Sequence, residues 1–394
     1  AKASGLSGHI FCGYQGWFNC EGDGANLGWR HYEKQGRFEP GHCTIDYWPD
    51  VSELEADEKF ATAFKHADGS TAYVFSPYLA KTVRRHFRWM REYGIDGVFV
   101  QRFATSATSS RTGPAVDQVL QNCRAAAEAE QRSFVVMYDL SGLQPGRIER
   151  VIDDWKRLCD KMQITSSTAY LRHEGKPLVA AWGLGFRDRK VPPKEWDRLV
   201  KFLQHDPKYG GCAVMLGVPT GWQSLSRDCI EDPMVLKVIE QADVVSPWTV
   251  GRYGGPAAIR KHATQFWQAD MAWCQNRGIE YLPVVFPGFS WHNMKPEDPL
   301  DHIPRRKGEF FWNQCTEAKR VGADSLYVAM FDEIDEGTAI FKCTNDPPVG
   351  ESPFLTYEGL PTDWYLRIAG QARRLLRGEI PTTAPLQQVM EAKQ

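Results

Sequence analysis

The sequence predicts an α/β fold of the (β/α)₈ class, a TIM barrel with a long loop after its first strand. Three observations predict it: short apolar runs recur along the 394 residues, a helical pattern follows each run, and no change in composition marks a second domain. Near-continuous apolar strands that alternate with helices are typical of parallel strands buried on both faces. Eight such units close a barrel, so we expect residues 1–394 to form one barrel domain.

The predicted strands are the apolar runs at residues 9–18, 97–103, 133–139, 177–183, 212–218, 243–248, 281–288 and 325–333. The clearest helix runs from Pro77 to Tyr93, where apolar residues recur at spacings of four, four and three. Other helices are expected at 115–131, 145–162, 192–205, 229–241, 256–277, 308–321 and 362–377. Pro77 and Pro145 suit first turns, where the missing N–H has no partner to lose.

The first connection, residues 19–76, is too long for a plain loop in a compact domain. We expect it to form an insertion lobe over the mouth of the barrel. Cys20 and Cys43 both lie in this segment and are the best candidates for a disulfide. Cysteines within apolar patterns are expected to be free buried thiols, namely Cys12, Cys123, Cys159, Cys212, Cys274 and Cys315.

Composition excludes several classes of partner. The 47 basic and 49 acidic residues nearly cancel, so the chain lacks the positive charge of a nucleic-acid binder. No run of 18 apolar residues predicts a membrane span. The cysteines show neither a C-x-x-C pair nor zinc spacing, and we expect no metal and no cofactor. The chain begins Ala-Lys without Met, which fits a secreted or periplasmic protein after loss of a signal peptide, and fits a trimmed chain equally well.

Aromatic and polar residues follow the predicted strands, where the active site lies in this fold. With 14 Trp and nearly neutral charge, the pattern favours stacking on sugar rings, although each Trp also suits a core. Tyr253 can equally pack on the barrel rim. The residues expected to bind substrate are Tyr14, Trp17, Trp48, Gln101, Arg102, Asp139, Trp182, Trp248, Arg252, Tyr253 and Trp291, and Gln15 also ends a strand.

The segment "MFDEIDEGTAIF", residues 330–341, carries four carboxylates in five positions where the eighth strand leaves the core. If the chain turns at Glu333, then Glu333 and Glu336 project to the same side, and Asp332 and Asp335 point elsewhere, toward Arg or backbone N–H groups. A purely structural role, as a cluster that caps a helix N-terminus, is the competing interpretation. Two close glutamates in an aromatic site are pushed to different pKa values, which favours acid–base chemistry and glycoside hydrolysis.

The segments "GIDGVFVQRF", "GKPLVAAWG", "SPWTVGRY", "VVFPGFSW" and "FDEIDEGT" resemble glycoside hydrolase family 99, the endo-α-mannosidase and endo-α-mannanase group. The resemblance runs from about Gly8 to the final barrel helix. It implies a retaining barrel enzyme in which Glu333 and Glu336 are the catalytic carboxylates. In that family the first glutamate is thought to deprotonate the sugar 2-hydroxyl to give a 1,2-anhydro sugar, and the second protonates the leaving oxygen and then activates water.

One departure is the pair Ile334-Asp335, where the family commonly carries Trp-His. The added carboxylate leaves the substrate open. The expected function is a retaining, endo-acting α-glycoside hydrolase directed at α-mannosides, with an oligosaccharide or polysaccharide substrate. Two rival functions stay open: a catalytically impaired glycan-binding barrel, and a barrel hydrolase of another specificity, such as an α-glucanase or a xylosidase- or arabinosidase-like enzyme.

Overall fold

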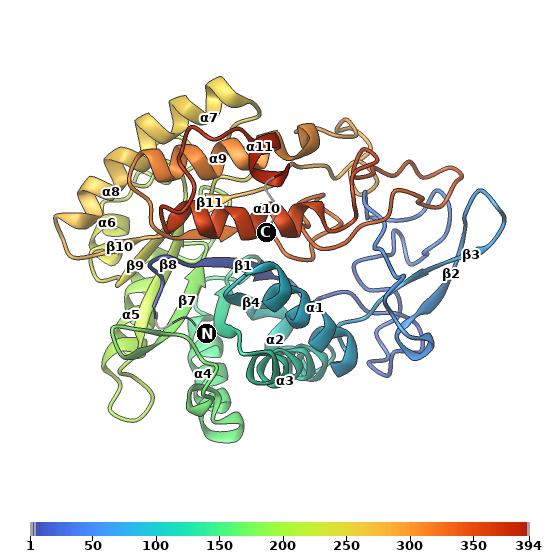
Figure 1. Cartoon of the computed structure of the whole chain (residues 1–394). Coiled ribbons are helices and arrows are strands. Elements are labelled where there is room, and N and C mark those ends of the chain that lie inside the picture. The colour runs from blue at the N-terminus through green and yellow to red at the C-terminus, as the bar shows by residue number, and fades with distance from the viewer. Residues whose placement is uncertain (1–2, 4, 392–394) are drawn as a thin grey trace.

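The computed structural model describes residue 3 and residues 5–391, and its parallel strands are wrapped by helices (Figure 1). The strands are β1 (Ile10–Tyr14), β4 (Gly97–Phe103), β5 (Ser133–Asp139), β7 (Lys176–Trp182), β8 (Ala213–Val218), β9 (Val244–Pro247), β10 (Glu280–Tyr281), β11 (Val284–Val285) and β12 (Leu326–Val328). The predicted (β/α)₈ class is confirmed.

The barrel closes through its seventh strand position, which is split into β10 and β11. The sheet order is β10-β9-β8-β7-β5-β4-β1-β12-β11, so the two halves of one stretch lie at the two ends of the path. Leu282 N–H donates to the Val245 carbonyl, and the next residue, Pro283, accepts from Tyr327 N–H. Proline has no N–H to donate, which explains why the apolar run 281–288 is not one continuous strand.

Helices cover the outside of the barrel (Figure 1). They are α1 (Ala80–Tyr93), α2 (Ala104–Ala107), α3 (Gly113–Glu130), α4 (Ile148–Met162), α5 (Pro193–His205), α6 (Met234–Ile239), α7 (Pro256–His262), α8 (Gln268–Gln275), α9 (Glu309–Arg320), α10 (Trp364–Leu376) and α11 (Leu386–Glu391). A π-helical stretch, Ala263–Trp267, joins α7 to α8. Each predicted helix is present; that at 229–241 is shorter, because Pro233 directly precedes its first turn.

Residues 19–76 contain an antiparallel hairpin, β2 (Phe60–Lys65) and β3 (Thr71–Val74), and their own aromatic cluster around Phe38, Trp48 and Phe64. Isolated bridges join this lobe to the segment after β12, at Pro49–Cys343, Tyr47–Leu355 and Lys65–Val349. Figure 1 shows the hairpin and that segment side by side at the right of the barrel. The lobe therefore packs on a loop at the carboxyl end of β12. That residues 1–394 form one domain stays a prediction.

The expected disulfide is wrong: Cys20 and Cys43 are free thiols. Cys20 donates to the Phe75 carbonyl, with an S–O distance of 3.2 Å, and Cys43 lies 3.9 Å from the Ile45 carbonyl oxygen, so each has a separate place in the lobe. The six cysteines expected as free thiols are free, and Cys159 alone among them is only partly buried. Within residues 5–391 no helix is long and apolar enough to cross a membrane, and no cluster of His, Cys, Asp and Glu suits a metal ion.

Candidate active site

The acidic segment begins with a carboxylate that joins two strand ends. Asp332 is fully buried, and its two oxygens accept hydrogen bonds from the backbone N–H groups of Gln15 and Gly16, both at 2.8 Å. These contacts fix the end of β1 beside the end of β12. The expectation that Asp332 points toward backbone N–H groups is confirmed, and its role is to hold the two neighbouring strand ends together.

Glu333 is held on both of its carboxyl oxygens. The Gln15 side-chain amide donates to one oxygen at 2.7 Å, and the Thr338 hydroxyl donates to the other at 2.6 Å. The residue is 4% exposed, so its carboxyl group is presented to the cleft from a fixed position rather than from a mobile surface side chain. Two donors on one carboxylate favour its charged form and oppose the cost of burial.

Glu336 differs from Glu333 in being partly exposed, and no hydrogen bond to its carboxyl group is found within residues 5–391. Its backbone is fixed instead, because its carbonyl accepts from Ser290 N–H at 3.0 Å. The next residue is Gly337, with a φ of +63°, and a Cβ there would lie 2.8 Å from Ser290 N. Only glycine fits this close approach, so the turn that aims Glu336 depends on Gly337.

A buried cation supports the same turn from behind. Arg305 is 3% exposed and donates to the carbonyl oxygens of Gly337 and Ala339, at 2.8 and 2.7 Å. Its guanidinium lies over the rings of Tyr47, Tyr357 and Tyr365. Arg305 therefore ties the β12 loop to the lobe and to helix α10 without neutralising any of the four carboxylates.

Asp335 connects the acidic segment to the lobe. Its carboxyl oxygen lies 3.4 Å from Nδ1 of His31, whose ring stacks on Trp17 with centroids 4.0 Å apart. Asp335 is buried, and its second oxygen has no hydrogen-bond partner within residues 5–391. Asp335 does not line the cleft with the two glutamates; its side-chain neighbour is a histidine, and backbone N–H groups of its own segment lower its pKa, in line with the expected backbone partners.

Glu333 and Glu336 line one cleft with residues from β1, β4, β5, β7 and the loops that follow them. Four aromatic residues stand in its walls in two pairs: Trp182 meets Trp248 edge to face at 5.3 Å, and Trp17 packs near Phe103 at 5.2 Å. The complete lining is Gln15, Trp17, Gln101, Phe103, Met137, Asp139, Ser141, Trp182, Arg189, Trp248, Met330, Glu333 and Glu336. Paired carboxyl groups between flat aromatic walls suit a sugar chain.

The four carboxyl groups of the segment all have raised pKa values. Burial, followed by the nearby Glu336, raises the pKa of Glu333 well above its ordinary value. Burial and then Asp335 raise the pKa of Glu336 to about 7. Burial raises the pKa of Asp332 to about 7 and that of Asp335 to about 8. Close glutamates that share protons near neutral pH can serve as one base and one acid.

Asp139 is a further carboxylate of the cleft, at the end of β5. Burial raises its pKa to about 6, and Ser141 N–H donates to it at 2.7 Å. It comes from a different part of the barrel than the glutamate pair. A carboxylate at this position could approach a bound sugar from another direction than Glu333 and Glu336.

Of the residues expected to bind substrate, Trp17, Gln101, Asp139, Trp182 and Trp248 line the cleft, and six others do not. Tyr14 and Arg102 point outward from their strands: the Tyr14 hydroxyl pairs with His86 on α1 at 2.8 Å, and Arg102 binds Asp154 on α4 at 2.6 Å. Each precedes or follows an inward-facing residue, and successive side chains of a strand point to opposite faces.

The remaining four of these residues also do not line the cleft. Trp48 is 1% exposed in the aromatic cluster of the lobe, and Arg252 binds Asp228 at 2.8 Å between two loops. Tyr253 donates to the Gln314 side chain at 3.0 Å behind the barrel wall, in agreement with the prediction that it can pack on the rim. Trp291 is partly exposed beneath the Lys295 ammonium, 3.7 Å away, outside the cleft lining.

Sequence reasoning missed Phe103, Met137, Ser141, Arg189 and Met330 as residues of the cleft. Phe103 and Met137 lie in apolar runs whose pattern gives no sign of which face is inward. Arg189 lies in the loop after β7, where its guanidinium rests 5.2 Å from the Trp182 ring. Arg189 lies seven residues after Trp182 in the sequence, so no spacing pattern pointed to this contact.

No protein-family model matches the sequence, and no curated protein matches it. Solved structures do match. The GH99 endo-α-mannosidase from Bacteroides thetaiotaomicron, in complex with bis-tris propane, is 17% identical with a TM-score of 0.67, over 95% of this chain and 98% of that one. A second structure of the same enzyme is 16% identical with a TM-score of 0.68 and the same coverage.

A further structure, described as a glycoside hydrolase-like protein, is 12% identical with a TM-score of 0.59, over 94% of this chain and 95% of that one. At these identities the likeness is one of fold. It extends over nearly the whole chain, so the resemblance noted in the sequence is confirmed at the level of fold.

Proposed function

We propose that this chain is a retaining, endo-acting α-glycoside hydrolase directed at α-mannosides, which uses the substrate 2-hydroxyl in catalysis. The observation that carries the proposal is that Glu333 and Glu336, three residues apart, line one cleft with Trp17, Trp182 and Trp248. The fold likeness to an endo-α-mannosidase supports the choice of substrate class.

In the proposed first step, Glu333 takes the proton of the 2-hydroxyl while the sugar O2 bonds to the anomeric carbon. Glu336 gives its proton to the glycosidic oxygen, which leaves, and a 1,2-anhydro sugar remains. Glu336 then takes a proton from water, which attacks the anomeric carbon, and O2 recovers its proton from Glu333. Both carboxyl groups return to their starting states, and the net reaction consumes one water.

The local contacts suit this division of roles. Glu333 accepts two hydrogen bonds, which lower its pKa and favour the carboxylate needed by a base, but burial and the neighbouring Glu336 outweigh them, so its pKa stays well above the ordinary value. Glu336 is more exposed and has a pKa near 7, which equips it to hold and release a proton at neutral pH. Because both residues come from one short segment, they approach a sugar from neighbouring directions, which leaves no place for one of them as a nucleophile on the opposite face.

The specific rival within the same cleft is a conventional mechanism with Asp139 as the nucleophile. Asp139 lies on β5, away from the glutamate segment, and it is buried in the same cleft. In that case Glu336 protonates the leaving oxygen and Asp139 forms a covalent bond to the anomeric carbon. A glycan-binding barrel without turnover and a hydrolase of another specificity also compete with the proposal, and the same experiment separates them.

The test compares Glu333→Gln and Glu336→Gln on natural α-mannans and on an α-mannoside with a good leaving group. Glu333→Gln should lower turnover of both substrates by about 10⁴-fold, because the anhydro sugar cannot form without a base. Glu336→Gln should retain part of the first step on the activated substrate and lose natural glycans. The matched control is Glu297→Gln, an exposed residue outside the cleft lining.

A 2-deoxy version of the activated substrate distinguishes the two mechanisms. It has no O2 to attack the anomeric carbon, so the wild-type enzyme should fail to cleave it. Efficient cleavage, with loss of that activity in Asp139→Asn, would replace the anhydro-sugar route by the Asp139 nucleophile. Glycans that bind without being cleaved would favour the binding barrel, and cleavage of α-glucans or pentosides alone would change the substrate class. The expected location outside the cytoplasm stays a prediction.

A further inference from the structure

One residue of the lobe, Asp46, joins the lobe to the loop that carries the glutamate pair. Asp46 is fully buried. Its backbone N–H donates to the Ile334 carbonyl at 3.0 Å, and its own carbonyl accepts from the Leu355 N–H at 2.8 Å. Both partners belong to the segment that follows β12, so the backbone of Asp46 lies between two parts of that segment.

The carboxyl group of Asp46 binds a second loop, the one that follows β11. It accepts hydrogen bonds from the Ser290 hydroxyl and from the N–H groups of His292 and Asn293, the last two at 2.7 and 2.8 Å. Three donors from four successive residues fix the course of this loop around one carboxylate, and such charge-assisted hydrogen bonds are stronger than neutral ones.

These contacts lead to Glu336. The Ser290 N–H donates to the Glu336 carbonyl at 3.0 Å, so Asp46 supports Ile334 directly and Glu336 through Ser290. The carboxyl group of Glu336 has no hydrogen bond within residues 5–391, and its direction therefore depends on its main chain. Glu333 differs, because two side-chain donors hold its carboxyl group and neither belongs to the lobe or to the loop after β11.

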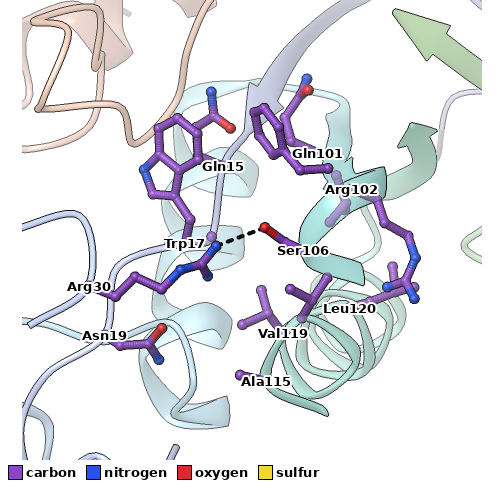
Figure 2. Close-up of a pocket in the computed structure, with 14 residues that line it drawn as sticks. Gln15, Trp17, Asn19, Arg30, Gln101, Arg102, Ser106, Ala115, Val119 and Leu120 are labelled. Carbon is purple, nitrogen blue, oxygen red and sulfur yellow. Dashed lines mark hydrogen bonds between the residues drawn. The ribbon is translucent and has the colours of Figure 1, made fainter. Parts of the chain in front are cut away.

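The lobe is attached to the barrel at a second place, which gives Asp46 a fixed support. Arg30 donates to the Ser106 hydroxyl of α2 at 3.1 Å, below Trp17 in Figure 2. The next residue, His31, stacks on Trp17 with ring centroids 4.0 Å apart. The lobe therefore contacts the barrel both beside α2 and at the loops after β11 and β12.

A second buried aspartate of the lobe shows that such a carboxylate need not reach the active site. Asp23 is 5% exposed and also accepts hydrogen bonds from backbone N–H groups and a hydroxyl. Its donors all lie within residues 19–76 and are Asn19, Cys20, Ala25 and Ser76. Asp23 thus stabilises the lobe alone, whereas Asp46 connects the lobe to the acidic segment.

We propose that Asp46 is a positioning residue for Glu336 and holds the turn that aims this carboxyl group into the cleft. The inference rests on the proposed function, in which Glu336 protonates the leaving oxygen. Small displacements of a reacting group lower turnover strongly, even when the altered residue does not touch the substrate. Loss of Asp46 should therefore impair leaving-group protonation and spare the step that depends on Glu333.

The test is Asp46→Asn, which keeps the shape of the side chain but leaves one oxygen for three donors. The kcat on α-mannan should fall about 10- to 100-fold, while KM changes less than about twofold. The first step on an α-mannoside with a good leaving group, followed as leaving-group release in a single turnover, should fall less than about threefold because it needs little protonation.

Asp23→Asn is the matched control, because it makes the same change at a buried aspartate of the same lobe. It should leave the ratio of the two rates as in the wild type, whatever its effect on stability. Ser290→Ala removes one donor to Asp46 and keeps the Ser290 N–H on Glu336, so it should shift the ratio in the same direction by less. It also tests the inference if Asp46→Asn does not fold. Equal losses on both substrates, or the same shift in Asp23→Asn, would overturn the positioning role.

Hydrogen exchange followed by mass spectrometry gives a readout that is independent of catalysis. Peptides that cover residues 288–294 and 332–338 should exchange about 10-fold faster in Asp46→Asn, because hydrogen bonds that close both loops are lost. The same peptides should exchange at the wild-type rate in Asp23→Asn. Unchanged exchange in Asp46→Asn would overturn the inference.

The two proposals can fail separately. If the wild-type protein cleaves no glycan, the hydrolase proposal fails, and the exchange rates alone decide whether Asp46 holds the Glu336 turn. If the wild type cleaves α-mannan and Asp46→Asn keeps the wild-type ratio of the two rates, the positioning role fails while the hydrolase proposal stands.

Discussion

One buried acidic cluster lies outside the barrel beside β4 and β5, another lies at the barrel mouth after β12, and the two differ in how their charges are compensated. On the outer face, Asp154 of α4 accepts hydrogen bonds from Arg102 at 2.6 and 2.7 Å, from Arg157 at 2.7 Å and from the Tyr138 hydroxyl at 2.7 Å. Burial alone would raise the pKa of Asp154, but these partners lower it. The outer cluster is thus electrically balanced.

At the mouth of the barrel, Asp332, Glu333, Asp335 and Glu336 have no arginine or lysine in an ion pair within residues 5–391. Their pKa values are raised, with burial as the largest cause in each case. Buried charge that is not compensated costs stability, and a fold has no structural reason to gather it. The contrast indicates that the outer cluster serves the fold and the mouth cluster serves chemistry.

The largest stability effect is expected from breaking the outer cluster. Asp154→Asn removes the more buried of the two carboxylates that balance Arg102, which is 1% exposed and keeps its positive charge, and leaves Asp117 as its only acidic partner among the described residues. Loss of one partner of a buried pair should lower the free energy of unfolding by about 3–5 kcal/mol. Urea unfolding, followed by circular dichroism, measures this change.

The control for that experiment is the neighbouring residue. Asp153→Asn makes the same chemical change on the same helix, where the side chain is 70% exposed and pairs with Lys156. Its effect should stay within about 0.5 kcal/mol. If both variants lowered the free energy of unfolding by the same amount, the outer cluster would contribute no more than an ordinary surface pair. It could then not be contrasted with the mouth cluster as a structural cluster.

The mouth cluster should make the protein less stable as pH rises. Its carboxyl groups have folded pKa values above their unfolded values, so the folded state binds more protons between those limits. Their contribution to stability is therefore fully present below about pH 4 and is lost as pH rises toward 7 and 8, the pKa values of Asp332, Glu336 and Asp335. Asp154, with a lowered pKa, has the opposite sign and loses its contribution only in acid.

We expect the free energy of unfolding to fall by at least about 1 kcal/mol between pH 5 and pH 8, and Asp335→Asn to flatten this decline. Urea titrations at several pH values measure it. Asp335 is chosen because it contacts His31 and not the cleft, so the variant changes the charge balance without replacing either glutamate of the pair. A stability that rises steadily from pH 5 to pH 8 would contradict the raised pKa values of the mouth cluster.

The same comparison explains how much the sequence could predict. The order of strands and helices follows from alternating apolar runs and helical spacing, and the barrel class follows from their number. Because the fold class fixes which strand ends meet, it also predicted that Glu333, Asp139 and Trp182 would lie at one mouth. For these residues, the alternation of apolar runs and helical patterns, and the fold class that it predicts, were sufficient.

Which side chains at a strand end point into the barrel, and which point outward to the helices, could not be predicted in the same way. Gln101 and Arg102 end one apolar strand, and both are buried, but Gln101 faces the barrel interior, where it donates to the Tyr327 hydroxyl at 2.8 Å. Arg102 faces the helices. Both faces of a parallel barrel strand are covered, so no alternation of polar and apolar residues reveals the inward face. Residues of the lobe, such as Trp48, pack through long-range contacts that sequence spacing does not record.

The smallest expected effect tests the reassignment of Tyr253 from the cleft to the barrel wall. Its hydroxyl donates to Gln314, whose amide in turn donates to the Phe286 carbonyl at 2.7 Å. Tyr253→Phe removes one buried hydrogen bond and keeps the ring against Phe286 and Phe310, so the free energy of unfolding should fall by about 1 kcal/mol.

The kcat/KM of Tyr253→Phe on a cleaved glycan should change less than twofold. In contrast, Trp248→Leu, which removes a wall of the cleft, should raise KM. A large loss of kcat in Tyr253→Phe at unchanged stability would contradict this assignment and show that the Tyr253 phenol takes part in catalysis.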